Sequence, residues 1–313
     1  MNKIRFGILG PGKISHRFVK GVKYSQHAVI TAVGGRDPIK TLAYARLYDI
    51  STITDYQGLC DSDVVDAVYI ALPPPLHKEW IINALRADKH VICEKAMLYS
   101  IDDLNECFDL AASRGLFLME AQKTVFLPTT RKVKEWIQQG KLGKVSYIEA
   151  GYCYKFGEPS EHWVFDAEHG GGSLFDVGVY PISYALELFG TNIQSVSVKR
   201  NLLCGGSDGF AHIQLKFASG VIASLSSAIT VEGVKEARIY GSEGYVILPD
   251  FWKSSTVKLF RYDGDDEVFL VDQPSEFTHY IDHGCECIKK GLIESPILTK
   301  ALNETMIRLI TSK

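Results

Sequence analysis

Short apolar runs alternate with amphipathic segments in the first part of the chain, up to about residue 120. The apolar runs are rich in β-branched residues and predict strands, whereas apolar residues at helical spacing predict helices between them. The predicted strands are Ile4–Leu9, Val29–Val33, Val64–Leu72, His90–Cys93 and Leu116–Met119; the predicted helices are Lys13–Val22, Ile39–Tyr48, Leu76–Leu85 and Ile101–Ala112, the last ended by Gly115 as a left-handed cap. Apolar strands that alternate with amphipathic helices indicate a parallel sheet covered on both faces.

The pattern changes after Glu120. Longer runs, several of which alternate polar and apolar residues, predict strands at Val145–Tyr154, Ser195–Lys199, Ala211–Phe217, Val221–Ile229 and Ala237–Tyr240, with helices at Thr129–Gln139, Leu174–Phe189, Glu276–Lys290 and Thr299–Ile310. Such alternation is typical of an antiparallel sheet with one buried face. We therefore predict an α/β domain at residues 1–120 and, at residues 121–313, an α+β domain with a large, mainly antiparallel open sheet.

Length and composition agree with two globular domains. The chain has 313 residues, of which 46% are hydrophobic and 23% charged, and a domain takes about 150 residues. With 34 Lys+Arg against 37 Asp+Glu, the net charge is −3, so a nucleic acid, which binds basic surfaces, is not an expected partner. No apolar run approaches the roughly 18 residues that span a bilayer, so no membrane partner is expected either.

The seven cysteines are scattered, odd in number and without a CxxC pair. This usage is typical of reduced thiols, and we expect a cytoplasmic protein. Cys285-Glu286-Cys287 lies in a helical run without partners nearby, so we expect no metal site there.

The first predicted strand leads into a glycine turn, Gly10-Pro11-Gly12-Lys13-Ile14-Ser15. In the Rossmann dinucleotide fingerprint the first glycine allows the tight turn, the second lets the backbone approach a pyrophosphate, and the third position needs a small residue, here Ser15. The following helix directs its free N–H groups at the phosphates. Because the turn follows a strand and opens a helix, it indicates an N-terminal Rossmann dinucleotide-binding domain.

The second predicted strand ends in Gly34-Gly35-Arg36-Asp37. An acidic residue at this place takes the ribose hydroxyls of NAD, whereas an arginine accommodates the 2′-phosphate of NADP. Arg36 comes first, so we expect NADP to be preferred, with NAD as the second option and Lys13 or Lys40 as a further positive charge. The plain alternative is an Arg36–Asp37 surface pair at the start of a helix.

Further blocks resemble one oxidoreductase family. Residues 88–96, DKHVICEKA, are similar to the block GKHVxxEKP of the Gfo/Idh/MocA oxidoreductases, and residues 66–77, DAVYIALPPPLH, to the strand and turn DaVyIaTPnxxH of that family. Residues 170–181, GGGSLFDVGVYP, resemble GGGxLxDxGxH with tyrosine in the last place. That tyrosine and residues 115–121, GLFLMEA, are closer to the dimeric dihydrodiol dehydrogenase branch. The resemblance covers nearly the whole chain.

The resemblance implies a nicotinamide cofactor on the first domain and a small-molecule substrate (a sugar, polyol or vicinal diol) on the second. Placed on the matching motifs, the residues expected at the cofactor are Gly10, Gly12, Lys13, Ile14, Gly35, Arg36, Leu72, Pro73, His77, Glu94 and Lys95. His162 and Trp163 are expected to wall the substrate pocket, although a plain packing role fits them equally well.

The same resemblance nominates Lys95, Asp176 and Tyr180 as catalytic residues. The cofactor performs the hydride transfer, so the chain must move one proton. Asp176 and Tyr180 are four residues apart on one predicted helix and therefore share a face. Of these two, only Tyr180 has a proton to give at neutral pH. The alternatives without a catalytic role are that Lys95 is a surface lysine, Asp176 a helix cap and Tyr180 a core tyrosine.

Lys95 is expected to tune Tyr180. Tyrosine has a pKa of about 10 in isolation, and a lysine ammonium about 4 Å away favours the phenolate by about 4 kcal/mol at an effective dielectric constant of about 20. Ala96 replaces the proline of the family block, which loosens a constraint on Lys95. A cis bond without proline costs about 3–4 kcal/mol, so we expect a trans peptide bond between Lys95 and Ala96.

These patterns together predict an NAD(P)-dependent dehydrogenase or reductase of a sugar, polyol or diol. Two alternatives stay open: an NAD-assisted glycosidase, which a tightly retained and unconsumed cofactor would favour, and a non-catalytic cofactor-sensing regulator, which a missing lysine or tyrosine would favour. The outer face of residues 211–217 and 221–229 still carries apolar or small residues. We therefore expect a homodimer through this open sheet, the assembly that the resemblance also implies.

Overall fold

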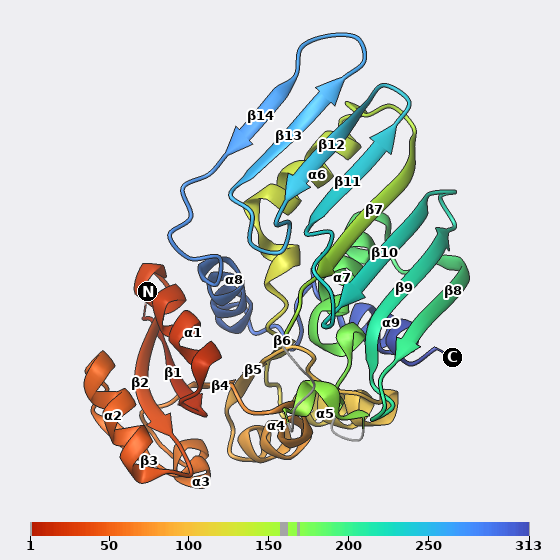
Figure 1. Cartoon of the computed structure of the whole chain (residues 1–313). Helices are drawn as coiled ribbons and strands as arrows, with labels where there is room; N and C mark the ends of the chain where they lie inside the picture. The colour runs from red at the N-terminus through yellow and green to blue at the C-terminus, as the bar shows by residue number, and fades with distance from the viewer. Residues whose placement is uncertain (1, 157–161, 168–169, 313) are drawn as a thin grey trace. The chain divides into compact units, whose positions relative to one another are not determined.

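The computed structural model describes residues 2–156, 162–167 and 170–312. The chain divides into two compact units, one of Met1–Gln122 with Pro274–Lys300 and one of Lys123–Gln273 with Ala301–Lys313 (Figure 1). The first division lies close to the predicted boundary at residue 120. Residues 274–300, which the sequence pattern assigns to the second domain, belong instead to the first unit.

The first unit is built on six parallel strands in the order β3-β2-β1-β4-β5-β6. The strands are β1 (Ile4–Leu9), β2 (Ala28–Gly34), β3 (Thr52–Thr54), β4 (Ala67–Ile70), β5 (His90–Cys93) and β6 (Leu118–Glu120); the helices are α1 (Lys13–Tyr24), α2 (Pro38–Tyr48), α3 (Tyr56–Cys60), α4 (His77–Arg86), α5 (Ile101–Ser113) and α8 (Thr278–Lys289). This confirms the predicted Rossmann domain. β3 and α3 are new, because elements of three and five residues are too short to show a period.

Local sequence explains where several of these elements begin and end. Asp37 caps α2 by accepting hydrogen bonds from the N–H groups of Ile39 and Lys40, and Ser100 caps α5 through the N–H group of Asp103. After α5, Gly115 has φ +64°, as predicted for a left-handed residue at a helix end. β4 is buried along its whole length, which is typical of the centre of a parallel sheet.

α8 closes the first unit from the far end of the chain. Gly21 of α1 lies against Phe277 and Ile281, and Gly284 of α8 lies against Ile92 of β5. A side chain at either glycine would collide with these neighbours, so the elements approach one another closely. The sequence pattern misplaces this helix because an amphipathic helix carries no mark of the sheet that it covers.

The second unit contains eight strands in the order β14-β13-β12-β11-β7-β10-β9-β8. They are β7 (Val145–Cys153), β8 (Ile193–Leu202), β9 (Asp208–Phe217), β10 (Ile222–Ala228), β11 (Glu236–Gly241), β12 (Gly244–Pro249), β13 (Thr256–Arg261) and β14 (Glu267–Leu270). β7 and β10 run parallel, and the other described neighbours run antiparallel. The mainly antiparallel sheet is thus confirmed, and β12 to β14 extend it beyond the strands named from sequence.

One face of this sheet is covered by helices and the other is open (Figure 1). α6 (Pro128–Gln138) and α7 (Val179–Phe189) pack on the covered face, and α9 (Lys300–Thr311) ends the chain. Along β9 the buried side chains of Ala211, Ile213 and Leu215 alternate with the more exposed ones of His212 and Gln214. The alternation seen in the sequence therefore separates the core from the open face.

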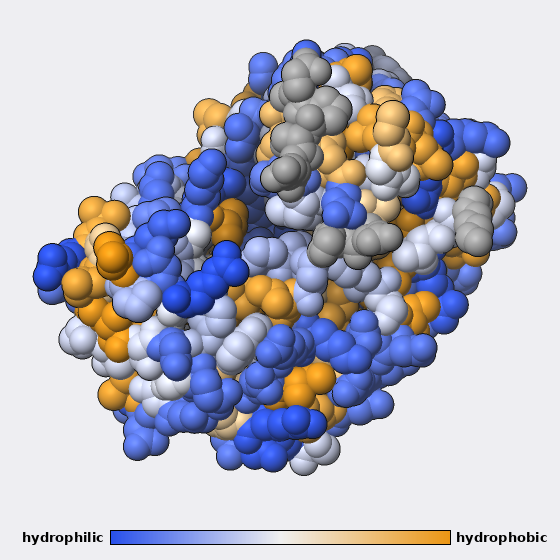
Figure 2. Space-filling view, turned by 60° about the horizontal axis from the view of Figure 1, so that its bottom comes forward, coloured by the Kyte–Doolittle hydropathy of each residue, from blue (hydrophilic) through white to orange (hydrophobic). Residues whose placement is uncertain are grey.

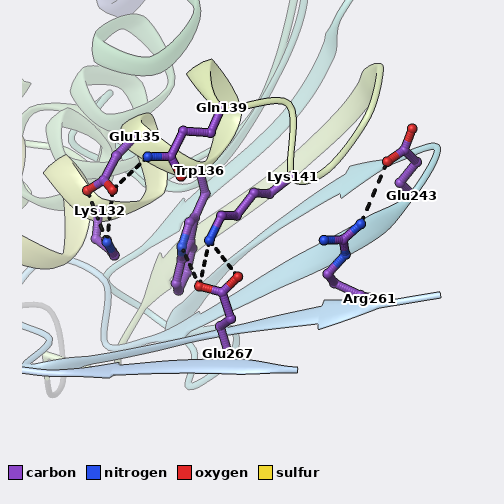
Figure 3. A network of polar contacts seen from close by, with 8 residues as sticks. All are labelled: Lys132, Glu135, Trp136, Gln139, Lys141, Glu243, Arg261 and Glu267. Atoms are coloured by element: carbon purple, nitrogen blue, oxygen red, sulfur yellow. Dashed lines mark hydrogen bonds and ion pairs between the residues drawn. The ribbon is translucent and has the colours of Figure 1, made fainter. Parts of the chain in front are cut away.

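A polar network ties the end of α6 to the last strand (Figure 3). Glu267 of β14 accepts hydrogen bonds from Lys141 Nζ at 2.6 Å and from Trp136 Nε1 at 3.2 Å. The hydrogen bond from Lys141 lowers the pKa of Glu267. Lys132, on the same helix, forms an ion pair with Glu135 at 3.0 Å. These contacts fix the end of α6 on the edge strand β14.

No helix in the described part of the chain is long and apolar enough to cross a membrane. On the face turned forward in Figure 2, hydrophilic residues predominate and hydrophobic residues form separate groups among them. Scattered apolar residues on a surface are normal for a folded protein and indicate no function by themselves.

Candidate active site

The glycine turn lies between β1 and α1, as predicted. Gly10 has φ +101°, and a side chain there would collide with Leu72 and with the carbonyl oxygen of Ala71. Gly12 precedes α1, and no side chain among the described residues caps this helix end. Ser15 is fully buried, and its hydroxyl donates to the Gly12 carbonyl at 2.7 Å. The start of α1 therefore offers backbone N–H groups to an anion such as a pyrophosphate.

At the end of β2 the two charged residues have different roles. The Asp37 carboxylate accepts hydrogen bonds from the N–H groups of Ile39 and Lys40 at 3.0 and 3.1 Å, and the bond from Lys40 lowers the pKa of Asp37. Arg36 has an exposed side chain, and Lys40 Nζ lies 3.7 Å from Asp37. The acidic group is thus committed to the helix cap, and both cations lie at the tip of the strand.

A cavity of about 370 Å³ lies at this edge of the first unit. Its walls come from the glycine turn, the tip of β2, the start of α3 and the residues after β4: Gly10, Pro11, Gly12, Arg36, Asp37, Lys40, Thr41, Tyr56, Ala71, Leu72 and Pro73. The structure therefore brings together Gly10, Gly12, Arg36, Leu72 and Pro73 from the predicted cofactor residues. Lys13 and Ile14 follow in the first turn of α1, and Gly35 lies against Pro11 and Thr41 behind the wall.

Tyr56 is a wall residue that sequence reasoning misses. It begins α3, and its ring centre lies 5.2 Å from that of Trp80 in an edge-on arrangement. Burial raises the pKa of Tyr56, and the charge of Arg36 opposes this rise. Asp55, which caps α3, is the signal that could have revealed it, because a cap followed by an aromatic residue marks a helix start at a strand end.

His77 lies behind the cavity. Its ring is fully buried; Nε2 is 2.9 Å from the carbonyl oxygen of Leu72, and Nδ1 is 3.2 and 3.1 Å from those of Ala96 and Met97. Burial lowers the pKa of His77. The ring thus connects a cavity wall residue with the loop that carries Lys95. That loop contains a cis peptide bond between Lys95 and Ala96, so the predicted trans bond is wrong.

Two buried carboxylates back the loop of Lys95. Glu94 accepts a hydrogen bond from the hydroxyl of Tyr69 at 2.5 Å, and Glu120 accepts one from the N–H group of Met97 at 2.9 Å. Burial raises the pKa of Glu120 to about 7, while the charge of Lys95 opposes the rise. The carboxylate of Glu94 is thus directed toward the interior of the first unit, and its predicted role at the cofactor stays a prediction.

In the second unit a glycine turn at residues 170–173 leads into the predicted catalytic helix. This helix begins as a π-helical turn, η5 (Leu174–Gly178), before α7, which corrects the prediction of one regular helix over Leu174–Phe189. Gly178, which favours no single backbone conformation, closes the π turn. Asp208, at the start of β9, accepts hydrogen bonds from the Ser173 hydroxyl at 2.5 Å and from the Leu174 N–H group at 2.9 Å. This carboxylate anchors the start of the helical segment.

Asp176 and Tyr180 flank the junction of the π turn and α7. Asp176 Oδ2 accepts a hydrogen bond from the Tyr154 hydroxyl at 2.7 Å, and the pKa of Tyr154 is raised, first by burial and then by the charge of Asp176. Tyr180 is 9% exposed. Its ring centre lies 5.7 Å from that of Tyr152 and 5.7 Å from Lys123 Nζ. The structure therefore places both predicted residues in a cluster of tyrosines with a lysine.

Sequence reasoning misses three members of this cluster, Lys123, Tyr152 and Tyr154. Lys123 begins η2 (Lys123–Phe126) and is 3% exposed. Tyr152 lies near the end of β7 and Tyr154 directly follows this strand; Tyr152 stacks on Trp252 with ring centres 3.8 Å apart. The signal in the sequence is that Lys123 is a lone lysine within a largely apolar stretch. A lysine buried there needs a compensating partner for its charge.

His162 and Trp163 lie at the start of η3 (Trp163–Phe165). His162 is exposed, its ring centre is 4.6 Å from that of Phe156, and its Nδ1 accepts a hydrogen bond from the N–H group of Val164 at 3.3 Å. Trp163 is half-buried. These contacts cap the short helix and pack it against an aromatic ring, and the role of both residues toward a substrate stays a prediction.

The two units carry complementary chemistry. The first offers a glycine turn, a helix start and a cation-bearing cavity, which together suit the phosphates of a dinucleotide. The second offers a phenol, a carboxylate and an ammonium, which suit proton transfer. Together they are typical of an oxidoreductase that uses a nicotinamide dinucleotide.

The chain belongs to the Gfo/Idh/MocA oxidoreductase family. Residues 4–122 match the model of an oxidoreductase family with an NAD-binding Rossmann fold, and residues 130–247 match that of the GFO/IDH/MocA C-terminal domain. The resemblance found in the sequence blocks is thereby confirmed.

Several characterised proteins are similar over almost their whole length. The chain is 30% identical over 300 residues to scyllo-inositol 2-dehydrogenase (NADP(+)) IolU of Bacillus subtilis (strain 168), covering 93% of this chain and 90% of that protein. It is 29% identical over 323 residues to trans-1,2-dihydrobenzene-1,2-diol dehydrogenase of Sus scrofa, covering 98% and 95%. The solved structure of an aldose-aldose oxidoreductase from Caulobacter crescentus, complexed with glycerol, superimposes with a TM-score of 0.90 at 26% identity, covering 99% and 96%.

Proposed function

We propose that this protein is an NADP-dependent dehydrogenase or reductase acting on a CH–OH group of a sugar, polyol or vicinal diol, with Tyr180 as acid and base. The carrying observation is the cluster around Tyr180, in which a nearly buried phenol lies beside Tyr152 and Lys123. The names of the three relatives, an inositol dehydrogenase, a dihydrodiol dehydrogenase and an aldose-aldose oxidoreductase, support this substrate class.

The residues of this chain move the proton. A bound nicotinamide supplies the hydride acceptor for oxidation and the donor for reduction. Tyr180 takes the proton of the substrate hydroxyl during oxidation and returns it during reduction. Asp176, whose carboxylate accepts a hydrogen bond from Tyr154, is suited to holding a substrate hydroxyl. Lys95 is proposed to tune Tyr180, a role that rests on the family motif.

Arg36 and Lys40 support NADP over NAD. The 2′-phosphate carries nearly two negative charges, and a guanidinium can bind it through two parallel hydrogen bonds. Asp37, the residue placed to take ribose hydroxyls, has its carboxylate engaged in the cap of α2. The Bacillus relative bears NADP(+) in its name.

The test follows NADPH absorbance over a panel of aldoses, inositols, diols and dicarbonyl compounds. Tyr180→Phe keeps the ring and removes the hydroxyl, so NADPH affinity should persist while turnover falls about 10²–10⁴-fold. Tyr184→Phe is the matched control, since it removes another buried hydroxyl from α7. Turnover of Tyr180→Phe within a few-fold of the parent would refute the assignment, and no absorbance change on any substrate would refute the function.

The two alternatives receive no support from the three relatives reported above, which are named as dehydrogenases and an oxidoreductase. A glycosidase would release sugar from a glycoside without net change in NADPH absorbance. A regulator would bind NADPH but leave its absorbance unchanged with every substrate. The same panel, extended by glycosides, therefore separates all three.

We also propose a homodimer through the open face of the second unit's sheet. Tyr147, Tyr240, Tyr245 and Phe260 form a row across β7, β11, β12 and β13, with successive ring centres 5.8, 6.0 and 4.9 Å apart. All four are half-buried, and aromatic residues are enriched at interfaces. Light scattering at micromolar concentration should give the mass of a dimer, and Tyr245→Asp should shift it toward a monomer. A parent protein with the mass of a monomer would contradict this proposal.

We also propose that the protein is cytoplasmic. All seven cysteines are free thiols, and six of them are buried, which suits a reducing compartment. Fractionation of cells that express the protein should recover it with cytoplasmic markers, and recovery with an exported fraction would contradict this location.

A further inference from the structure

Lys123 is a buried lysine to which the proton transfer described above gives no role. Its side chain is 3% exposed, and its ammonium lies 5.7 Å from the centre of the Tyr180 ring. Removing an ammonium from water is costly, so such a residue is retained only where its charge is compensated. η2, which begins with Lys123, packs directly against α7, the helix of Tyr180.

We propose that Lys123 is a positioning residue for the reaction: its ammonium stabilises the phenolate of Tyr180 and so sets the pH range in which Tyr180 accepts a proton. This inference rests on the proposed function, because it gives a task to the phenolate of Tyr180. It goes beyond the family motifs, which place the lysine of the site at Lys95.

Electrostatics gives the size of the effect. The neutral phenol offers an ammonium only the weak attraction of its ring face, whereas the phenolate offers a full negative charge. The ammonium lies 5.7 Å from the centre of the ring that would carry the phenolate charge. At a separation of this order and an effective dielectric constant of about 20, one unit charge moves the titration of its partner by about one to two pH units. A shift of this size supplies part of the fall from a pKa of about 10 that a tyrosine needs to act near neutral pH.

Three further titratable residues of the second unit lie near this cluster, Asp176, Tyr152 and Tyr154, and none of these three carries a positive charge. Asp176, from η5, is a carboxylate and disfavours a second negative charge nearby. Tyr152, from β7, and Tyr154, which directly follows β7, are phenols. Burial together with Asp176 raises the pKa of Tyr154, which keeps it neutral. The ammonium of Lys123, from η2, favours the phenolate against these groups.

An absorbance titration of Tyr180 tests the proposal without relying on activity. The phenolate band of each background is measured with and without Tyr180→Phe, and the difference reports Tyr180 alone. Lys123→Met keeps the length of the side chain and removes the charge, so the midpoint should rise by about one to two pH units. Lys123→Arg keeps the charge and should restore most of the shift. Lys132→Met, which removes a lysine lying over Trp136 on α6, should leave the midpoint unchanged.

The outcomes separate this inference from the proposed function. A midpoint of Lys123→Met equal to that of the parent overturns the role of Lys123, whatever the activity of the protein. A raised midpoint together with full activity of Tyr180→Phe supports the coupling and refutes the proton transfer by Tyr180. Where a substrate is found, the basic limb of the plot of kcat/KM against pH should move with the midpoint of the titration. A limb that stays in place overturns the claim that Lys123 sets the pH range of proton transfer. Should Lys123→Met fail to fold, Lys123→Gln carries the same expectation.

Discussion

A buried carboxylic acid should make the stability of the first unit depend on pH. Burial raises the pKa of Glu120 from 4.5 to about 7. The folded state therefore holds this proton more tightly than the unfolded state, so the stabilisation is complete below pH 4.5 and is lost as the pH rises through about 7. The two pKa values differ by 7 − 4.5 = 2.5, which corresponds to about 3 kcal/mol in the free energy of unfolding.

The perturbation is Glu120→Gln, which keeps an oxygen to accept from the Met97 N–H group and carries no charge at any pH. At about pH 5 the free energies of unfolding of the parent and the amide variant should differ by less than about 1 kcal/mol, whereas at about pH 8 the variant should be more stable by about 3 kcal/mol. Urea unfolding, followed by tryptophan fluorescence across this range, measures the difference between the two proteins.

Glu135→Gln is the matched control, because Glu135 is an exposed carboxylate on α6 paired with Lys132. Its difference from the parent should be small and nearly constant over the same range. Lys95→Met should enlarge the effect at Glu120, since the charge of Lys95 opposes the rise in its pKa. If the free energies of unfolding of the parent and of Glu120→Gln keep a constant difference from about pH 5 to about pH 8, the reasoning is refuted.

Three further predictions concern the cofactor, the helix anchor and the thiols. Arg36→Ala should weaken NADP binding by about 2–3 kcal/mol and leave NAD nearly unchanged in fluorescence titrations; equal losses would make Arg36 a general contact instead. Asp208→Ala removes the acceptor for Ser173 and should lower turnover with NADPH affinity unchanged, whereas parental turnover would show that the helical segment needs no anchor. Cys204 is exposed and the other six thiols are buried, so a thiol reagent should label one site in the native protein and the rest only after unfolding. Burial raises the pKa of Cys60 to about 12, which slows its reaction, and rapid labelling of two or more sites would contradict this burial.

The first unit could be predicted well because its signals are local. The turn from Gly10 to Ser15 needs a positive φ and a close backbone approach, and these requirements select particular residues at fixed spacing. Arg36 and Asp37 follow a strand by the same rule, yet the sequence leaves their roles open. Only the structure shows that Asp37 is engaged in the cap of α2.

The cluster around Tyr180 could be predicted only in part, because it joins segments far apart in the chain. Asp176 and Tyr180 belong to one motif, whereas Lys123 precedes them by more than fifty residues and Tyr154 follows a separate strand. No short-range pattern connects these residues; their contacts arise from the packing of η2 and β7 against α7. The π turn escapes prediction for a related reason, since one extra residue in a helical turn leaves no clear mark on apolar spacing.

The return of α8 to the first unit has a consequence for synthesis. The chain crosses between its units after Gln122, Gln273 and Lys300, so the helix that covers Gly21 and Ile92 is made after the whole of residues 123–273. At about 5–20 residues per second, the nascent cofactor-binding unit remains without this cover for roughly 8–30 s. A fragment ending at Gln122 would lack it permanently. On the ribosome, the part of the protein that is translated first is therefore among the last to be completed.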